Sequence, residues 1–317
     1  MAGAPDTFQV RFERKWAHLT RPHVRALAWL LDGPDLLDPG HALWEGKIAT
    51  LGQIGPATAI WLAALEEDPA PLEAALGVRS HARLGLYAEA LMAFYFEQQR
   101  CLVAHGLQVR ANLHQTLGEF DFLLRSGATL WHWEFATKFY LLQDGPDDAI
   151  ERLVGPGLTD TLGAKMRKII GQQLLLGRHP AAQSLLPQAL AGAQALVKGW
   201  LFYRDDVVPA MAGIGAAHNH GFWCPLEQAA NLRGEHFVVL ARRQWLAPVK
   251  AALGVEVLSR QELPGALAKC FATMAAPVMV AAVREENGWI LEQERGFVVP
   301  DHWLVEAGAR ARAALPS

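Results

Sequence analysis

The chain has 317 residues, of which 51% are hydrophobic and 19% are charged, and its formal net charge is −3. This length is enough for a substantial core in one large domain or two modest ones, and the composition excludes an intrinsically disordered protein. The slightly acidic balance argues against a strongly basic protein that coats nucleic acid, but it leaves room for a local basic groove.

No segment has the pattern of a membrane anchor or a secretion signal. The longest apolar stretch, 274–283, is too short to cross a bilayer and contains a proline. The opening Met-Ala-Gly-Ala-Pro-Asp lacks both the basic start and the apolar core of a signal peptide. Three widely spaced cysteines form neither a disulfide framework nor a CxxC metal site. We therefore expect a cytoplasmic protein with no membrane partner.

The first third of the chain is expected to be helical. Apolar residues recur at helical spacing over 21–31, just before the breaker Asp32-Gly33-Pro34. Two short helices are expected over 60–65 and 71–76. A long helix over about 80–105 would end at Gly106, because glycine favours a left-handed cap.

Strand patterns dominate the rest of the chain. Short or alternating apolar runs predict strands over 107–112, 118–124, 130–142, 200–203, 237–241, 278–283 and 296–300. Helices are expected over 159–176 and 180–196. Arg125-Ser126-Gly127 and Asn287-Gly288 are typical of hairpin turns. This order indicates a mixed α/β fold around one sheet.

The two strands joined at Arg125-Ser126-Gly127 carry carboxylates. Along 118–124, Phe120 and Phe122 are expected on one face, and Glu119 and Asp121 on the other, because side chains alternate in a strand. Along 130–142 the odd-numbered side chains are mostly large and apolar, so that face is expected to be buried. The opposite face carries Glu134, which would share a face with Asp121 if the strands pair.

Glu89 adds a third carboxylate from an apolar stretch of the long helix. Together, Glu89, Asp121 and Glu134 have the oxygen ligands that Mg²⁺ (or Mn²⁺) prefers. Lys138, further along the second strand, would polarise a phosphate or lower the pKa of an attacking water. The plainer alternatives are a Glu89–Arg83 ion pair, or an exposed Glu89, and a solvated strand face bearing Glu134 and Lys138.

These residues resemble the PD-(D/E)XK nuclease-like superfamily. The matching segments are Arg83-Leu84-Gly85-Leu86-Tyr87-Ala88-Glu89, Gly118-Glu119-Phe120-Asp121 and Glu134-Phe135-Ala136-Thr137-Lys138. The resemblance implies a restriction-endonuclease-like core of helix, three-stranded meander, helix and strand. It also implies catalytic roles for Glu89, Asp121, Glu134 and Lys138, with Mg²⁺ or Mn²⁺ as cofactor. The helix after the meander would offer Lys165, Lys168 and Gln172 to the substrate backbone, although such a stripe is also typical of a solvent-exposed helix face.

More specifically, the chain is similar to a bacterial family called domain of unknown function 1853. The similarity rests on Leu84-Gly85-Leu86-Tyr87, Leu117-Gly118-Glu119-Phe120-Asp121-Phe122-Leu123-Leu124, His132-Trp133-Glu134, Lys138-Phe139-Tyr140-Leu141, Gly199-Trp200-Leu201-Phe202-Tyr203 and Arg295-Gly296-Phe297-Val298-Val299-Pro300. It implies three regions: an N-terminal helical extension over 1–79, the nuclease-like core over 80–205, and a C-terminal mixed α/β region over 206–317 packed on the same core.

One departure from the superfamily pattern bears on activity. The pattern has an acidic residue two positions before the lysine, where this chain has Ala136. Glu134 lies four positions before Lys138, about 13 Å along a strand. Either the two residues serve opposite ends of the site, or a bulge closes the gap, or Glu119 supplies the missing ligand, or activity has been lost.

These alternatives lead to three hypotheses about the function. The first is an Mg²⁺-dependent nuclease that hydrolyses phosphodiester bonds of DNA or RNA. The second is a catalytically inactive scaffold of the same fold that binds nucleic acid or protein. A weaker third is a metal-dependent hydrolase of small phosphates.

Overall fold

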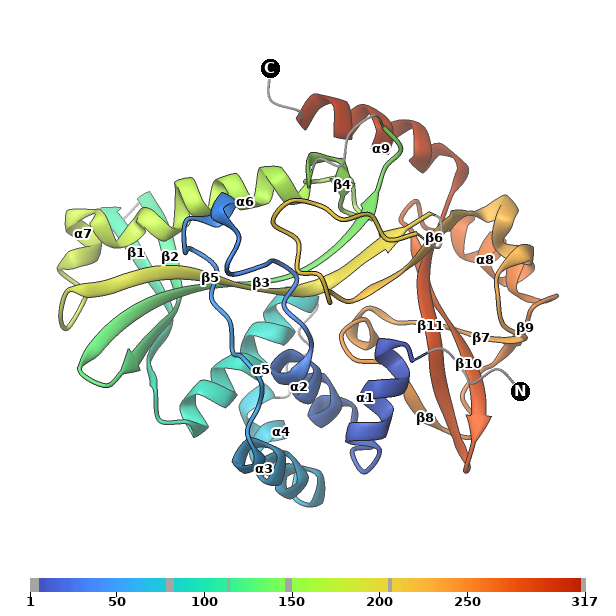
Figure 1. Cartoon of the computed structure of the whole chain (residues 1–317), viewed down its shortest axis with the longest axis horizontal. Helices are drawn as coiled ribbons and strands as arrows, with labels where there is room; N and C mark the ends of the chain where they lie inside the picture. Colours follow the sequence, from blue (N-terminus) through green and yellow to red (C-terminus); the bar gives the residue numbers. More distant parts are fainter. Residues whose placement is uncertain (1–5, 78–82, 113–114, 146–149, 205–206, 315–317) are drawn as a thin grey trace.

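A large mixed sheet runs through the molecule and carries helices on both faces (Figure 1). The computed structural model describes residues 6–77, 83–112, 115–145, 150–204 and 207–314. The expected region boundaries at 79/80 and 205/206 lie outside the described residues. No helix among the described residues is long and apolar enough to cross a membrane.

The α-helices of the described chain are concentrated in its first third, as expected. They are α1 (Phe8–Trp16), α2 (Pro22–Asp32), α3 (Pro56–Glu67), α4 (Ala70–Leu76), α5 (Leu84–Gln98), α6 (Leu162–Gly171), α7 (Pro180–Gln183), α8 (Leu263–Phe271) and α9 (Asp301–Ala314). The 3₁₀ helices are η1 (Ala42–Trp44), η2 (Ile150–Arg152), η3 (Gln173–Arg178), η4 (Leu226–Asn231) and η5 (Arg242–Gln244). The predicted helices over 21–31, 60–65 and 71–76 are confirmed as α2, part of α3, and α4.

The eleven strands of the described residues form one sheet in the order β1-β2-β3-β5-β6-β11-β10-β7-β9, with β4 on β3 and β8 on β11. Their bounds are β1 (Leu102–Asn112), β2 (Gln115–Ser126), β3 (Thr129–Leu142), β4 (Leu153–Val154), β5 (Leu190–Tyr203), β6 (His220–Pro225), β7 (His236–Val239), β8 (Lys250–Ala252), β9 (Leu258–Ser259), β10 (Val278–Glu286) and β11 (Trp289–Val299). Both predicted hairpins are confirmed, β2–β3 and β10–β11. The predicted strand over 296–300 is the end of β11.

The prediction of a long helix that ends at Gly106 is wrong for the second half of that segment. The part over 80–82 lies outside the described residues, and α5 ends at Gln98. The polar run after Phe96 leaves the helix no apolar face to bury, and Arg100 turns the chain with a φ of +55°. Strand β1 then begins at Leu102 and contains Gly106, whose φ of +63° is the left-handed geometry that glycine adopts readily.

The helix predicted over 180–196 is also wrong for most of its length. Only α7 is helical, and from Leu190 the chain forms β5, which pairs in parallel with β3 along its whole length. Long-range pairing overrides the helical preference of an Ala/Leu/Gln-rich segment. Gly199 permits this approach, because a Cβ there would lie only 1.9 Å from the carbonyl oxygen of Lys138. The helix predicted over 159–176 is shorter, with α6 passing into η3.

Helices cover β3 on both sides. On the side where α2 and α5 lie in Figure 1, Phe135 and Phe139 join the largest buried cluster. On the side of α6, Ala136 and Tyr140 pack with Met166 of that helix. The expected burial of the odd-numbered face is confirmed for Phe135, Phe139 and Leu141, whereas Trp131, Trp133 and Thr137 are half-buried. Most of the other face is buried as well. The hypothesis of a solvated strand face at Glu134 is therefore wrong, because its side chain is only 3% exposed.

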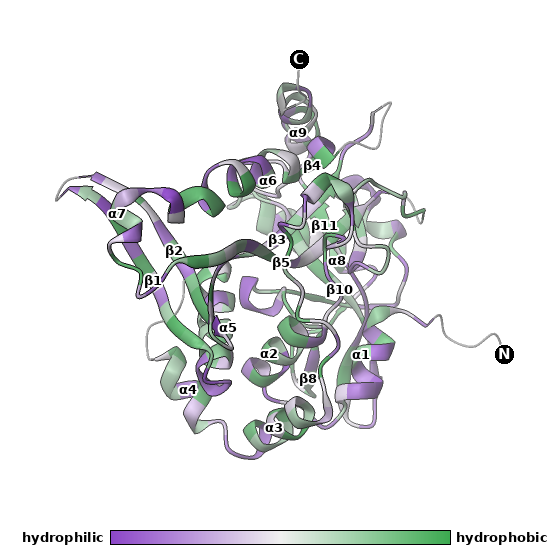
Figure 2. Ribbon diagram, turned by 60° about the vertical axis from the view of Figure 1, so that its left-hand side comes forward, coloured by the Kyte–Doolittle hydropathy of each residue, from purple (hydrophilic) through white to green (hydrophobic). Residues whose placement is uncertain are grey.

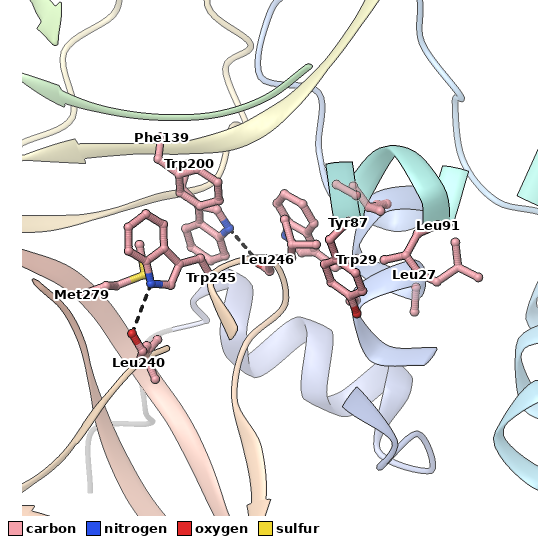
Figure 3. Close-up of a cluster of buried hydrophobic side chains, with 14 of the residues drawn as sticks. Leu27, Trp29, Tyr87, Leu91, Phe139, Trp200, Leu240, Trp245, Leu246 and Met279 are labelled. Atoms are coloured by element: carbon pink, nitrogen blue, oxygen red, sulfur yellow. Dashed lines mark hydrogen bonds between the residues drawn. The ribbon is translucent and has the colours of Figure 1, made fainter. Parts of the chain in front are cut away.

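Tryptophans join the N-terminal helices to the sheet. Figure 3 shows Trp200 of β5 between Trp29 of α2 and Trp245, and the Trp29 and Trp200 rings stack 6.4 Å apart. The indole Nε1 of Trp200 donates to the carbonyl of Leu246 at 3.0 Å. The hairpin of β1 and β2 extends to one side of the molecule, with hydrophilic and hydrophobic residues interspersed along it (Figure 2).

Candidate divalent-cation site

Strands β2 and β3 separate part-way along their length. Their backbone pairing runs from Ser126↔Thr129 to Phe122↔Trp133 and then ends. The amide of Phe135 donates instead to the Asp121 side chain, at 2.8 Å from Oδ2. A buried amide that loses its ladder partner needs such an acceptor. The carboxylate of Asp121 is therefore fixed at the point where the two strands part.

Strand β2 also turns over at this point. Phe122 packs against Phe135 on the α5 side of β3, with ring centroids 6.0 Å apart. Phe120 packs against His132 on the opposite face, at 4.8 Å. Residues two apart on a regular strand face the same way. The prediction that Phe120 and Phe122 share a face is therefore wrong, and the turn lets groups from both sides of the sheet meet at Asp121.

Three carboxylates converge there. One oxygen each from Glu89 of α5 and from Glu119 and Asp121 of β2 lie within 4.8 Å of one another. Oxygens around a six-coordinate Mg²⁺ are about 3–4 Å apart, since each lies at 2.0–2.1 Å from the ion. The three side chains are partly buried and keep access to solvent. Their donor type and spacing fit a hard divalent cation.

A histidine that the sequence analysis did not select lies beside this cluster. The Nε2 atom of His105 on β1 is 2.8 Å from Oε1 of Glu89. The hydrogen bond that His105 donates to Glu89 raises the pKa of His105. The charges of Glu89 and Asp121 raise it further, while burial lowers it. The predicted helix through residue 105 concealed it. Glu89 is therefore paired with His105 rather than with Arg83.

Glu134 of β3 is more deeply placed than the other carboxylates. Its Oε1 accepts a hydrogen bond from Nε2 of Gln173, the first residue of η3. Burial raises the pKa of Glu134, and the charges of Glu89 and Glu119 add to the effect, while the charge of Lys165 opposes it. Burial also raises the pKa of Asp121, and the nearby charge of Glu134 raises it further. Glu134 therefore adjoins the three-carboxylate cluster through Asp121.

Lys165 of α6 is the lysine whose positive charge acts on the Glu134 carboxylate. Its Nζ donates to Oε1 of Gln173 at 3.2 Å, so Lys165, Gln173 and Glu134 form a chain of hydrogen bonds. Burial lowers the pKa of Lys165, and the charges of Lys138 and Lys168 lower it further, while Glu134 raises it. Lys138, Lys165 and Lys168 therefore lie close enough for their charges to interact. Gln172 is exposed at the C-cap of α6, and its neighbour Gln173 makes the contact with Glu134.

Lys138 is engaged outside the carboxylate cluster. Its Nζ lies 3.4 Å from Oδ2 of Asp160, which also accepts the hydroxyl of Tyr140 at 3.1 Å. Ala136, between Glu134 and Lys138, is buried. Of the alternatives that Ala136 raised, the placement of Glu119 with Glu89 and Asp121 agrees with Glu119 as a substitute ligand.

The raised carboxyl pKa values predict a pH-dependent stability. Without a cation, the folded protein retains protons that the unfolded chain releases above a pH of about 4. Their stabilising contribution is complete below the ordinary carboxyl pKa and is lost as the pH rises through the raised values. Above neutral pH, the crowded carboxylates therefore cost folding free energy.

We expect Glu134→Gln to raise the free energy of unfolding in EDTA at pH 8 by about 1–3 kcal/mol, since each pKa unit corresponds to about 1.4 kcal/mol. At pH 4 the difference should nearly vanish, because the wild-type carboxyl is then protonated in both states. Urea unfolding at the two pH values measures this. Glu97→Gln, an exposed position on α5, is the matched control. An equal effect of Glu134→Gln at both pH values would contradict the electrostatic origin.

The fold and the site together define a mixed α/β protein with a candidate divalent-cation site where two strands of its sheet separate. The chain belongs to the family described as domain of unknown function (DUF1853), whose model matches residues 25–299. The match includes every candidate site residue from Glu89 to Gln173 and confirms the family expected from the sequence motifs. No curated protein and no solved structure matches the chain.

Proposed function

We propose that this protein is a divalent-cation-dependent nuclease with a restriction-endonuclease-like core. The order α5, β1–β2–β3, α6, β5 agrees with the helix, three-stranded meander, helix and strand of that core. The observation that carries the proposal is the convergence of Glu89, Glu119 and Asp121 beside a group of lysines. Carboxylates that hold a cation next to cationic side chains suit a phosphodiester substrate, which is anionic and must be polarised.

The residues divide into two groups in this proposal. Glu89, Glu119 and Asp121 hold Mg²⁺ or Mn²⁺. Glu134 lies beside Asp121 and adds a further carboxylate to the site. The cation would polarise the phosphate and lower the pKa of the attacking water. Lys165 lies where it can neutralise negative charge that develops on the phosphate, and Gln173 holds both Lys165 and Glu134 in place. Lys138 adds positive charge from its position beside Asp160.

The proposed substrate is DNA or RNA. Lys168 and Gln172 are exposed at the end of α6, next to Lys165, and can contact the phosphate backbone without recognising sequence. Since the chain as a whole has a net charge of −3, affinity for nucleic acid must come from this local group. Binding through such a group falls as salt rises.

The nuclease proposal predicts that Glu89→Gln lowers Mg²⁺-dependent cleavage about 100-fold or more, because one charged oxygen ligand becomes neutral. The matched control is Glu97→Gln, eight positions further along the same helix and exposed, which should cleave like the wild type. Labelled single- and double-stranded DNA and RNA, incubated with Mg²⁺ or with EDTA, provide the measurement. Equal cleavage by the wild type and Glu89→Gln would mean that a contaminant cuts the substrate.

Two observations favour a second candidate function, a catalytically inactive scaffold that binds nucleic acid or protein. Ala136 occupies the position of an acidic ligand, and Lys138 is paired with Asp160. A scaffold would bind nucleic acid without saturable uptake of Mg²⁺ or Mn²⁺. Calorimetric titration of the wild-type protein with either ion separates the two functions.

A further inference from the structure

His132 of β3 is a buried polar side chain without a hydrogen bond. Its side chain is 0% exposed, and within the described chain neither ring nitrogen has a hydrogen-bonding partner. The edge contact with Phe120 fixes one side of the ring. A buried imidazole usually satisfies at least one nitrogen, since leaving a polar group unpaired costs about 1–3 kcal/mol.

Glu134, the group opposite His132, also has a polar atom without a hydrogen-bonding partner among the described residues. Oε1 of Glu134 accepts the Gln173 amide, but the buried Oε2 has no partner among the described residues. Nε2 of His132 lies 3.8 Å from that oxygen. The donor and acceptor of a hydrogen bond are about 2.7–3.2 Å apart, so this separation is too long by less than about 1 Å. Two unpaired polar atoms thus face each other on the inner side of the candidate site.

Binding of a cation would change what Glu134 requires. A carboxylate that shares a site with a divalent cation is ionised, so both of its oxygens then need partners. Gln173 satisfies one oxygen on the outer side. On the inner side, His132 is the facing group with a donor to offer. Its Nε2 lies 3.8 Å from Oε2 and has no other partner among the described residues, so an N–H on this nitrogen is free to be donated to Glu134.

We propose that His132 is a positioning residue for the cation site: its Nε2–H closes on Oε2 of Glu134 when the cation binds, and so fixes the carboxylate against Asp121. The inference rests on the proposed function, because it requires a cation at these carboxylates. In this arrangement His132 touches neither cation nor substrate and acts through Glu134 alone. It gives a physical reason for a histidine within a wall formed by Phe120, Leu123 and Leu130.

The expected effect is a loss of cation affinity. Groups that hydrogen-bond to metal ligands contribute about 10–100-fold to metal affinity. We therefore expect His132→Phe to weaken Mg²⁺ and Mn²⁺ binding 10–100-fold in calorimetric titrations of the full chain. His132→Gln, whose side-chain amide can place an N–H near Glu134, should recover much of the loss. A purely structural role would predict equal affinity in His132→Phe, His132→Gln and the wild type whenever the variants fold.

Nuclear magnetic resonance of the ¹⁵N-labelled histidine rings supplies a second readout. In EDTA, the His132 signal, assigned by its absence from His132→Phe, should show a proton on Nε2. Saturating Mg²⁺ should move this proton downfield, because the hydrogen bond to Glu134 shortens. In Glu134→Gln, where the ligand charge is absent, Mg²⁺ should leave the signal in place.

The outcomes separate the inference from the nuclease proposal. Wild-type protein that binds Mg²⁺ with no change at His132, or with unchanged affinity in His132→Phe, would overturn the positioning role and leave the nuclease proposal standing. Loss of the Nε2 proton on adding Mg²⁺ would make His132 a direct ligand and also overturn it. Wild-type protein that takes up neither Mg²⁺ nor Mn²⁺ would overturn the proposed function itself.

Discussion

Asp121→Asn is expected to abolish saturable binding of Mg²⁺ and Mn²⁺ and to lower cleavage on the order of 10³-fold. Asp121 clusters with Glu89 and Glu119, and its charge interacts with that of Glu134. Asparagine keeps its shape and an oxygen for the amide of Phe135, so the change removes charge rather than structure. Removal of a single electrostatic group from an active site costs about 10²–10³ in rate, and here a ligand of the cation is lost as well.

Calorimetry at pH 8, followed by cleavage assays, measures both losses. Asp144→Asn is the matched control, because Asp144 follows β3, is 77% exposed and pairs with Arg204 rather than with the carboxylates. In EDTA, Asp121→Asn should unfold at no lower temperature than the wild type, since it relieves repulsion among the carboxylates. Tight Mg²⁺ binding by Asp121→Asn would show that the cation lies elsewhere.

Arg295→Ala is expected to lower the free energy of unfolding by about 3–5 kcal/mol, the cost of breaking a buried ion pair from one side. The guanidinium is fully buried, bonds both oxygens of Glu292 at 2.6 Å, and lies 4.4 Å from the ring centroid of Trp200. It also donates to the carbonyls of Trp245 and Ala247. Its loss would leave the Glu292 carboxylate buried and short of donors.

Urea unfolding at pH 7 measures this effect. Arg284→Ala is the control, because its ion pair with Glu286 on the β10 hairpin is exposed and such pairs contribute about 0–1 kcal/mol. Replacing Arg295 and Glu292 together by methionine should cost less than Arg295→Ala alone, since no unpaired charge then remains. If the double variant were the less stable of the two, the buried charge would not be the cause.

Local sequence patterns predicted an element reliably where its own residues determine where it begins and ends. The breaker after α2 and the turn residues of both hairpins can be recognised in the sequence, and the structure has these elements where they were expected. The errors fall on segments whose state depends on distant partners. Residues 190–196 have helical composition but form part of β5, because β3 offers a parallel partner along its length. The end of α5 was missed because β1, which follows it, is defined by pairing with β2.

The candidate site shows the same division. Glu89, Asp121 and Glu134 were selected from residue type and periodicity, with Glu119 as a substitute ligand. The structure brings Glu89, Asp121 and Glu119 together. His105 and Gln173 were not selected, because each reaches the carboxylates only through tertiary contacts. His132 lies two positions before Glu134 in the sequence, but only the structure shows that its ring nitrogens have no hydrogen-bonding partner among the described residues.

The sequence by itself determined the family, the mixed α/β class and most of the carboxylates of the candidate site, because these follow from motifs and local periodicity. Only the tertiary structure decided which groups meet. The turn of β2 at Asp121 brings carboxylates from both sides of the sheet to one point, and the packing of α6 and η3 makes Lys165 rather than Lys138 the lysine linked to Glu134. Such contacts depend on strand twist and long-range packing, for which no local stretch of sequence carries the information.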